Sequence, residues 1–248
     1  IFHAAGMVSA ARMTVNNPMT AISTNLVVTL KILEDLIKKN VKKILLFSSG
    51  TTGYPKYNHA VSEEEMFNDD PAEIYYGYGW SRRYTELLGN FASKKSNLKV
   101  AICRPTGVYG SYDDFDPSTS HVIPALIKRA IDKENPYVVW GDGEEIRDFL
   151  HVRDLVRGCF LLLEKNANSD PVNIGSGKEY KIKDIVKTIL NLTNNKDVNI
   201  EFDNTKPTTI PVRKVNVDKA KKLLGFEMKI SLEDGLKETI DWYKTKIK

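Results

Sequence analysis

The stretch Tyr75-Tyr-Gly-Tyr-Gly-Trp-Ser-Arg-Arg-Tyr-Thr-Glu86 places several aromatic side chains next to two arginines. If it is helical, Arg82 lies one turn after Tyr78 on the same face, because positions four apart are neighbours on a helix surface. A phenol and a fixed positive charge would then share one site. A nearby cation stabilises a phenolate, which a tyrosine needs in order to act as a base. The alternative is ordinary packing, with Arg82 and Glu86 forming a surface ion pair.

Two further segments each read as a buried strand. The first is the apolar run Ile44–Phe47, followed by the small and hydroxyl-bearing residues Ser48-Ser-Gly-Thr-Thr-Gly53. The second is Val100–Arg104, followed by Pro105-Thr-Gly-Val-Tyr-Gly110, which is typical of a turn. Each predicted strand thus ends in a segment rich in small residues.

The first residues, Ile1–Gly6, look like the end of another buried parallel strand. Dinucleotide-binding folds begin with a strand and a glycine-rich turn at a helix N-terminus, which holds the pyrophosphate. We find no such turn here. The glycine pairs at 141–143 and 175–177 lie far downstream and are interpreted as loops, because no strand, turn and helix surround them in that order.

Together these segments resemble the extended short-chain dehydrogenase/reductase family of nucleotide-sugar enzymes, the NAD-dependent epimerases and dehydratases. That family has Ser-Ser near a strand end, as at Ser48 and Ser49. It has Tyr-x-x-x-Lys on the next helix and Arg-Pro-Thr-Asn-Val-Tyr-Gly after the following strand. Here the lysine position is Arg82 and the asparagine position is Gly107.

Further motifs narrow the resemblance to the GDP-L-fucose synthase subfamily and extend it over nearly the whole chain. They are Tyr112-Asp-Asp-Phe115, Ser120-His-Val-Ile-Pro-Ala-Leu126, Val138-Val-Trp-Gly141, Ile146-Arg-Asp-Phe-Leu-His-Val152 and Asn173-Ile-Gly-Ser-Gly177. The resemblance implies an α/β fold: a Rossmann-like, doubly wound parallel sheet, N-terminally truncated by about 60 residues, with a smaller C-terminal α/β substrate domain. We assign residues 1–110 to the remainder of the dinucleotide-binding domain. Residues 111–248 form mainly the substrate domain, with some segments returning to the first.

The same resemblance implies catalytic roles. Tyr78 would exchange a proton with the sugar carbonyl while a hydride moves to or from the nicotinamide, and Arg82 would replace the lysine. His121 aligns with the histidine that works with a cysteine to epimerise the keto sugar at C3 and C5; the alternative is a helix-cap or loop histidine. Thr52 occupies the cysteine position. A threonine hydroxyl is a far weaker acid than a thiol, so epimerisation is weakened more than reduction.

The resemblance also implies binding residues for NADP or NAD and for the substrate. The cofactor residues are Ser48, Ser49, Gly50, Thr51, Arg82, Pro105, Thr106, Gly107, Val108 and His121. The family's hydroxyl partner of the tyrosine falls on Gly50, with Ser49, Thr51 and Thr52 as substitutes. The substrate residues are Arg129, Trp140 and Arg147, since an arginine fork suits diphosphate oxygens and an indole can stack on a base or sugar. The alternative for Trp140 is a core position. No metal site is expected.

Composition limits the classes of function. The chain has 248 residues, 42% of them hydrophobic and 27% charged, as in ordinary globular proteins. The net charge of +4 comes from dispersed lysines, so we expect no nucleic-acid partner. No apolar run could span a bilayer and no signal peptide is seen, which predicts a cytoplasmic protein without a membrane partner. Cys103 and Cys159 are expected to be buried free thiols.

Four other segments carry predictions, the first being a helix from about Ile182 to Leu192. Asn17–Asn40 reads as one helix with apolar residues at Ile22, Leu26, Leu30, Leu33 and Ile37, which indicates core or a partner helix. We expect this helix and the helix with Tyr78 to form a homodimer interface. The acidic run Glu63–Glu65 is interpreted as a solvated face. Ser231-Leu-Glu-Asp234 is typical of a capped helix start.

The first functional hypothesis is a nucleotide-sugar epimerase/reductase resembling GDP-L-fucose synthase, which converts GDP-4-keto-6-deoxymannose with NADP or NAD. The alternatives are another nucleotide-sugar 4-epimerase and a non-catalytic sugar-nucleotide-binding relative, the latter suggested by Arg82 and Gly50. A 4,6-dehydratase is disfavoured, because Thr52 and Gly53 stand where that class has an acidic pair.

Overall fold

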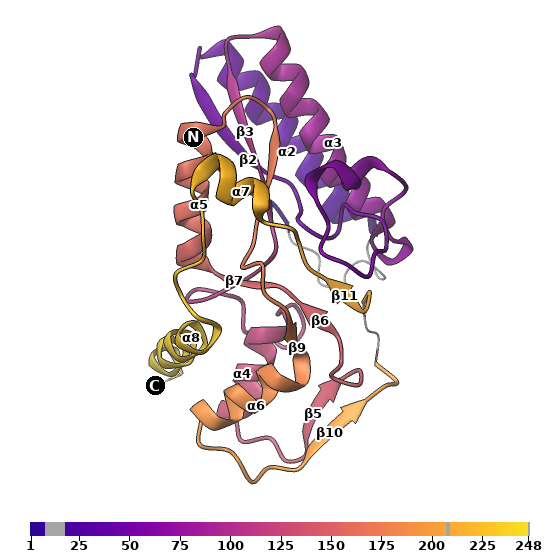
Figure 1. The fold of residues 1–248 in the computed structure, drawn as a ribbon, viewed down its shortest axis with the longest axis vertical. Helices are drawn as coiled ribbons and strands as arrows, with labels where there is room; N and C mark the ends of the chain where they lie inside the picture. The colour runs from indigo at the N-terminus through magenta and orange to yellow at the C-terminus, as the bar shows by residue number, and fades with distance from the viewer. Residues whose placement is uncertain (8–17, 207–208, 248) are drawn as a thin grey trace.

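The computed structural model describes residues 1–7, 18–206 and 209–247. Its main sheet has four parallel strands in the order β1-β2-β3-β8 (Figure 1). These strands are β1 (Phe2–His3), β2 (Lys43–Phe47), β3 (Lys99–Pro105) and β8 (Pro171–Ile174). The predicted strands therefore exist and pair in parallel, as expected for short apolar runs buried on both faces.

Helices cover both faces of this sheet. Helices α2 (Pro18–Lys38) and α3 (Tyr76–Lys95) pack on one face, and α5 (Val152–Lys165) and α7 (Asp218–Leu224) pack on the other. Successive residues of β2 point to opposite faces, so Ile44 and Leu46 join the first core while Leu45 joins the second. The doubly wound, Rossmann-like α/β class predicted from the sequence is confirmed.

Helix α2 is shorter than the predicted Asn17–Asn40, of which Asn17 lies outside the described residues. Leu33 is buried in the core, whereas Leu30 and Ile37 are exposed. The face toward the sheet includes polar residues, because Thr29 Oγ1 lies 3.2 Å from His3 Nε2 and both residues are buried. The apolar residues of α2 therefore divide between the two alternatives. Some pack in the core, and others lie on an exposed outer face.

The predicted turn after Arg104 is wrong. Strand β3 ends at Pro105, and Gly107–Tyr109 form β4, which pairs in parallel with β7 (Phe149–His151). Between them the Thr106 amide donates to Ile174 O at 3.1 Å and the Gly107 amide donates to Asp148 O at 3.2 Å. The chain stays extended because it passes from one sheet directly into another.

The remaining elements surround a separate hydrophobic core, seen below the main sheet in Figure 1. They are α4 (Val122–Ile131), β5 (Tyr137–Trp140), β6 (Ile146–Arg147), β9 (Tyr180–Lys181), α6 (Ile182–Leu192), β10 (Ile200–Asp203), β11 (Val212–Arg213) and α8 (Leu232–Lys246). The predicted α6 is confirmed, and Ser231 caps α8 by accepting from the Asp234 amide at 3.1 Å. A domain boundary at residue 110 stays a prediction.

The connection from β2 to α3 contains two 3-10 helices, η1 (Glu63–Phe67) and η2 (Glu73–Tyr75). The interpretation of Glu63–Glu65 as a solvated face is wrong for Glu63, which is only 6% exposed. Its carboxylate accepts from the Asn173 amide at 2.7 Å. The buried Glu63 therefore supplies a hydrogen-bond partner for a backbone N–H of β8. Glu65 instead accepts from the Ser62 amide and hydroxyl in a capping box.

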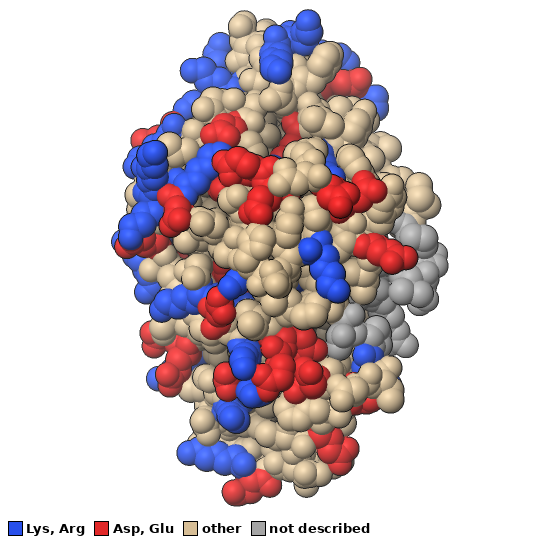
Figure 2. Space-filling model, turned by 45° about the vertical axis from the view of Figure 1, so that its right-hand side comes forward, with Lys and Arg blue, Asp and Glu red and all other residues tan. Residues whose placement is uncertain are grey.

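The thiols and the surface charges are as the sequence predicts. Both cysteines are buried and unbridged, and burial raises the pKa of the Cys103 thiol. Acidic and basic side chains are interspersed over the face seen in Figure 2. Among the described helices, none combines the length and apolar character needed to cross a bilayer.

Candidate active site

The predicted tyrosine–arginine pair lies in the first two turns of α3. The Arg82 guanidinium donates to the Tyr78 phenol oxygen at 2.5 Å, and its central carbon lies 4.7 Å from the ring centroid. Glu86 does not pair with Arg82; both its carboxylate oxygens bind the buried Arg104 at 2.7 Å. The alternative of an Arg82–Glu86 surface ion pair is therefore wrong, and the arginine serves the phenol.

The loop after β2 approaches α3 next to Tyr78. A Cβ atom at Gly79 would lie 2.5 Å from Thr52 O, so only glycine allows this approach. Ser48 Oγ also donates to Arg82 O at 3.3 Å. The loop and the helix are thus held against each other at the tyrosine.

Two hydroxyl groups in this loop form a hydrogen-bonded pair. Thr52 Oγ1 donates to Ser49 Oγ at 2.6 Å, and the Thr52 amide donates to the same oxygen at 3.0 Å. Since Ser49 Oγ accepts both, its own hydroxyl hydrogen remains available to a further acceptor. The Ser49–Thr52 pair is therefore a hydroxyl source beside the helix that carries Tyr78.

Gly50 lies too close to β3 for any side chain. Its amide donates to Pro105 O at 2.9 Å, and a Cβ atom there would lie 2.5 Å from that oxygen. A hydroxyl residue at this position would need the loop to move. This contact also brings together the two stretches predicted to hold the nicotinamide, Ser48–Thr51 and Pro105–Val108.

One buried donor at this junction has no partner. Arg82 Nε is inaccessible and forms no hydrogen bond among the described residues. Burial, together with the charge of Arg82, lowers the pKa of His3 at the end of β1. The partly exposed polar groups beside this donor, the Tyr78–Arg82 pair and the remaining hydroxyl hydrogen of Ser49, fit the hydroxyl-bearing ribose of a nicotinamide nucleotide.

His121 occupies the N-cap position of α4 and is exposed. Its position as a helix-cap residue agrees with the alternative interpretation, although its side chain makes no capping bond. It lies near Asp113. Burial raises the pKa of Asp113, and the charge of His121 offsets part of that rise. Within the described chain no hydrogen bond joins His121 to Thr52 or Tyr78.

The three predicted substrate residues belong to the C-terminal elements. Arg129 on α4 donates to Val138 O and pairs with Glu134 at 3.8 Å. Trp140, at the end of β5, is 41% exposed, so its interpretation as core is wrong. Arg147 on β6 donates to Thr209 Oγ1 at 2.9 Å and to Pro211 O at 3.0 Å. Arg129 is thus partly committed to its own helix and strand.

Sequence reasoning missed Arg213, which stands beside Arg147 in the register of β11 and β6. Burial and the neighbouring charge of Arg213 lower the pKa of Arg147 to about 10. Neither guanidinium has a carboxylate partner among the described residues. Two adjacent cations without an anion form an anion-binding arrangement. A two-residue strand has no periodic pattern, so the sequence holds little signal that points to Arg213.

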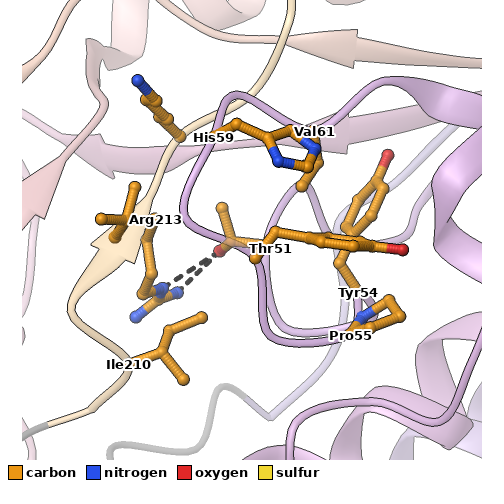
Figure 3. A pocket seen from close by; sticks show the side chains of 10 residues that line it. Thr51, Tyr54, Pro55, His59, Val61, Ile210 and Arg213 are labelled. Atoms are coloured by element: carbon orange, nitrogen blue, oxygen red, sulfur yellow. Dashed lines mark hydrogen bonds between the residues drawn. The ribbon is translucent and has the colours of Figure 1, made fainter.

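Arg213 also reaches the loop after β2. It donates to Thr51 Oγ1 at 2.8 Å and to the Tyr75 hydroxyl at 3.1 Å. Figure 3 shows the contact of Arg213 with Thr51 at a shallow pocket, which Tyr54, Pro55, His59 and Ile210 also line. The arginine therefore links the C-terminal elements to the hydroxyl loop and to the start of α3.

A doubly wound parallel sheet, with a tyrosine–cation pair beside a hydroxyl-rich loop, defines a dinucleotide-dependent α/β protein of the Rossmann type. The chain belongs to the NAD dependent epimerase/dehydratase family, whose model matches residues 1–175. The expected cofactor class, NADP or NAD, is thereby confirmed.

Individual relatives agree with this family. Putative GDP-L-fucose synthase 2 of Arabidopsis thaliana is 32% identical over 231 residues, which cover 91% of this chain and 70% of the relative. GDP-L-colitose synthase of Yersinia pseudotuberculosis is 27% identical and covers 98% of this chain and 80% of its own. The resemblance to extended short-chain dehydrogenase/reductases near GDP-L-fucose synthase is confirmed.

Solved structures share the fold. UDP-glucose 4-epimerase from Thermotoga maritima, with UDP-glucose, has a TM-score of 0.89 at 28% identity, covering all of this chain and 77% of that one. A GDP-L-fucose synthetase from Naegleria fowleri bound to NADP also has a TM-score of 0.89, at 22% identity, over 99% of this chain and 76% of that one.

Proposed function

We propose that the protein is a nucleotide-sugar epimerase/reductase that converts GDP-4-keto-6-deoxymannose with NADP or NAD. The observation that carries this proposal is the direct hydrogen bond from Arg82 to Tyr78 beside the Ser49–Thr52 hydroxyl pair. Support for the GDP-linked sugar comes from the relatives, two of which are GDP-sugar synthases at 27–32% identity.

In this proposal Tyr78 is the acid and base at the sugar oxygen. When the 4-keto group is reduced, the phenol gives its proton to the developing alkoxide; in the reverse direction the phenolate takes it back. Arg82 donates to the phenol oxygen and so stabilises the phenolate. The Ser49 hydroxyl, which already accepts from Thr52, would hold the substrate oxygen in place.

The residues at the loop–β3 junction would hold the cofactor. Ser48–Thr51 and Pro105–Val108 offer closely approaching backbone, and the partly exposed Ser49 hydroxyl offers a donor. The bound nicotinamide would supply hydride acceptor or donor chemistry.

Arg147 and Arg213 would bind the diphosphate of the sugar nucleotide. A guanidinium fork matches phosphate oxygens, and a diphosphate would neutralise two cations that otherwise repel each other. Trp140 stays exposed at the end of β5 and would stack on the base or sugar. His121 would act as the base that removes protons next to the carbonyl.

The test is turnover of GDP-4-keto-6-deoxymannose with NADPH, followed by nicotinamide absorbance and by NMR of the sugar. We expect one nicotinamide oxidised for each sugar reduced, because reduction consumes the hydride. Binding of the sugar nucleotide without any turnover would instead support a non-catalytic relative.

A second candidate is a UDP-sugar 4-epimerase, favoured by the likeness to the Thermotoga maritima enzyme at 28% identity. A 4-epimerase oxidises and re-reduces the same carbon, so it leaves the nicotinamide absorbance unchanged over many turnovers. Interconversion of UDP-glucose and its 4-epimer without net cofactor use would favour this candidate over the first.

A further inference from the structure

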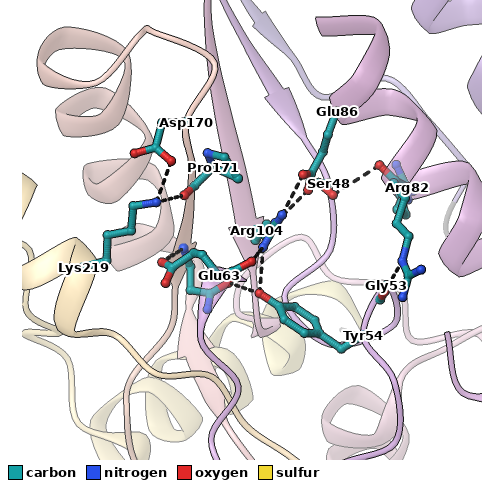
Figure 4. A network of polar contacts seen from close by, with 12 residues as sticks. Ser48, Gly53, Tyr54, Glu63, Arg82, Glu86, Arg104, Asp170, Pro171 and Lys219 are labelled. Carbon is teal, nitrogen blue, oxygen red and sulfur yellow. Dashed lines mark hydrogen bonds and ion pairs between the residues drawn. The ribbon is translucent and has the colours of Figure 1, made fainter. Parts of the chain in front are cut away.

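A fully buried arginine on β3 joins several elements below the candidate site. Arg104 is 1% exposed, and all its nitrogens are used. Nε and one terminal nitrogen each donate to a Glu86 carboxylate oxygen at 2.7 Å. The other terminal nitrogen donates to the Tyr54 hydroxyl at 2.9 Å and to Glu63 O at 2.7 Å. Figure 4 shows Arg104 between Glu86 and Tyr54.

The partners of Arg104 are themselves satisfied. The Tyr54 hydroxyl donates to Asn173 Oδ1 at 3.0 Å, and Asn173 Nδ2 donates to Val61 O at 3.0 Å. Tyr54 and Asn173 are 1% and 0% exposed, and burial raises the pKa of Tyr54 to about 12. A buried network with every member paired holds its elements in one arrangement.

The network connects both halves of the candidate site. Glu86 lies one turn after Arg82 and two turns after Tyr78 on α3, so its carboxylate fixes the rotation of that helix. Tyr54 follows Thr52 by two residues and ends the hydroxyl loop. Pro105, the neighbour of Arg104, accepts from the Gly50 amide. One guanidinium thus sets where the helix and the loop meet.

We propose that Arg104, through Glu86 and Tyr54, is a positioning residue that aligns Tyr78 and Arg82 with the Ser49–Thr52 hydroxyls. This inference rests on the proposed function. Its physical basis is that acid–base catalysis depends steeply on placement, so that an error of about 1 Å can cost roughly 100-fold in rate.

Positioning and mere stabilisation make different predictions. A buried ion pair contributes little net stability, because desolvation offsets the attraction, and a well-packed apolar pair can replace it. The double variant Arg104→Met with Glu86→Leu should therefore keep a melting temperature near that of the parent. It should still lose the alignment, since neither new side chain holds the helix to Tyr54.

The first experiment measures kcat and KM for the double variant on the substrate that the parent turns over. We expect kcat to fall by about 100-fold, with KM for the sugar nucleotide within about threefold, because Arg147 and Arg213 are untouched. The matched control is Arg157→Met, which breaks the ion pair to the buried Asp154 at 2.7 Å on the opposite face of the sheet. Its kcat should equal that of the parent.

Tyr54→Phe is the second variant, which keeps the proposal testable if the double variant does not fold. It removes only the hydroxyl that joins Arg104 to Asn173, and we expect kcat to fall by about tenfold, the weight of one buried hydrogen bond. Unchanged kcat in Tyr54→Phe, or in the double variant if it folds, would overturn the proposal. A loss of kcat in proportion to lost thermal stability, shared by Arg157→Met, would overturn it equally.

A spectroscopic measurement separates this proposal from the proposed function. Protein labelled with ¹³C at tyrosine Cζ gives a Tyr78 resonance, assigned with Tyr78→Phe, that reports contact of the phenol with Arg82. We expect this resonance to move in the double variant and to stay in place in Arg157→Met. A parent without turnover would defeat the proposed function alone; an unmoved resonance would defeat the positioning role.

Discussion

Arg82 donates to Tyr78 from a planar fork, where the resembled family has a compact ammonium. Replacing Tyr78 by phenylalanine removes the proton that the sugar oxygen needs, so we expect kcat to fall by about 100-fold or more. Replacing Arg82 by lysine keeps the charge, and we expect turnover to be kept or raised. Steady-state kinetics of both variants is the measurement. Equal kcat for Tyr78→Phe and the parent would remove Tyr78 from the mechanism.

Thr52 decides how the chemistry divides between reduction and epimerisation. The Thr52 hydroxyl donates a hydrogen bond to Ser49 Oγ at 2.6 Å. A hydroxyl ionises far less readily than a thiol. We expect the protein to reduce the keto sugar while exchanging the hydrogens at C3 and C5 slowly. Thr52→Cys should speed exchange more than reduction, whereas Thr52→Ser should change neither. Deuterium uptake from heavy water, followed by NMR beside nicotinamide absorbance, measures both rates. Rapid exchange by the parent, unaltered by the cysteine, would contradict this division.

Arg213 and Arg147 are expected to bind the diphosphate of the sugar nucleotide, so losing one of them should weaken substrate binding. Arg213→Met removes charge-assisted hydrogen bonds worth about 1.5–3 kcal/mol, so KM for the sugar nucleotide should rise roughly 10- to 100-fold. Unliganded thermal stability should change little, because the relieved repulsion on Arg147 offsets the lost hydrogen bonds to Thr51 and Tyr75. The neighbouring Lys214→Met, which breaks only an ion pair to Glu179, is the control. A larger KM change for Lys214→Met than for Arg213→Met would exclude the diphosphate assignment.

The sequence predicted the parts of the site that are local and missed those that are not. The spacing of Tyr78 and Arg82 follows from helix geometry alone, and the structure confirms their contact. Arg213 comes from a strand of two residues and meets Arg147 only through sheet register. Burial of Glu63 depends on the Asn173 amide, which is 110 residues away. No local pattern encodes such partners.

Helix α5 begins at a histidine that must stay neutral. His151 is 1% exposed, and its Nδ1 accepts from the Arg153 amide at 3.4 Å, which a protonated ring could not do. Burial lowers the pKa of His151, while Glu238, 3.7 Å from Nε2, opposes that shift. The unfolded histidine therefore takes up a proton at a higher pH than the folded one. The free energy of unfolding should fall as pH drops below about 6.5.

Two variants of this cap should change the pH dependence in opposite directions. His151→Asn keeps a good N-cap residue and removes the titration, so the loss of stability in acid should become shallower. Glu238→Gln removes the group that supports the charged ring, so the loss should become steeper. Urea unfolding between about pH 5 and pH 8 measures both slopes. Parallel curves for all three proteins would show that His151 does not control acid stability.

Among the elements, long periodic segments and the buried strands β1, β2 and β3 were predictable, whereas the short strands β4, β6 and β11 were not. Helix α6 matches its predicted bounds because its apolar spacing is regular and buried on one side. The sequence predicts a turn where β4 forms, since Thr-Gly is typical of turns. Pairing with β7 overrides that preference, and the partner lies more than 40 residues downstream.

At the scale of the whole molecule, the paired helices α2 and α3 both expose large apolar side chains. On α3 the large exposed side chains recur every three or four residues, at Tyr76, Trp80, Tyr84, Leu87 and Phe91. On α2 they are Met19, Val27, Leu30 and Ile37. The two helices lie side by side in Figure 1. Each helix thus exposes large apolar side chains, and exposed apolar surface of this kind marks an interaction site.

We expect this surface to join two copies of the chain, because closed two-fold dimers are the commonest soluble oligomers and one face can then cover itself. The double substitution Leu87→Glu with Phe91→Glu places four like charges at a two-fold interface and should yield monomers. Val156→Glu, on the equally exposed face of α5, is the matched control and should leave the dimer intact. Light scattering at micromolar concentration distinguishes these states. A monomeric parent would refute the dimer. A dimer that survives both glutamates would move the interface away from α3 and leave its apolar face to a different partner.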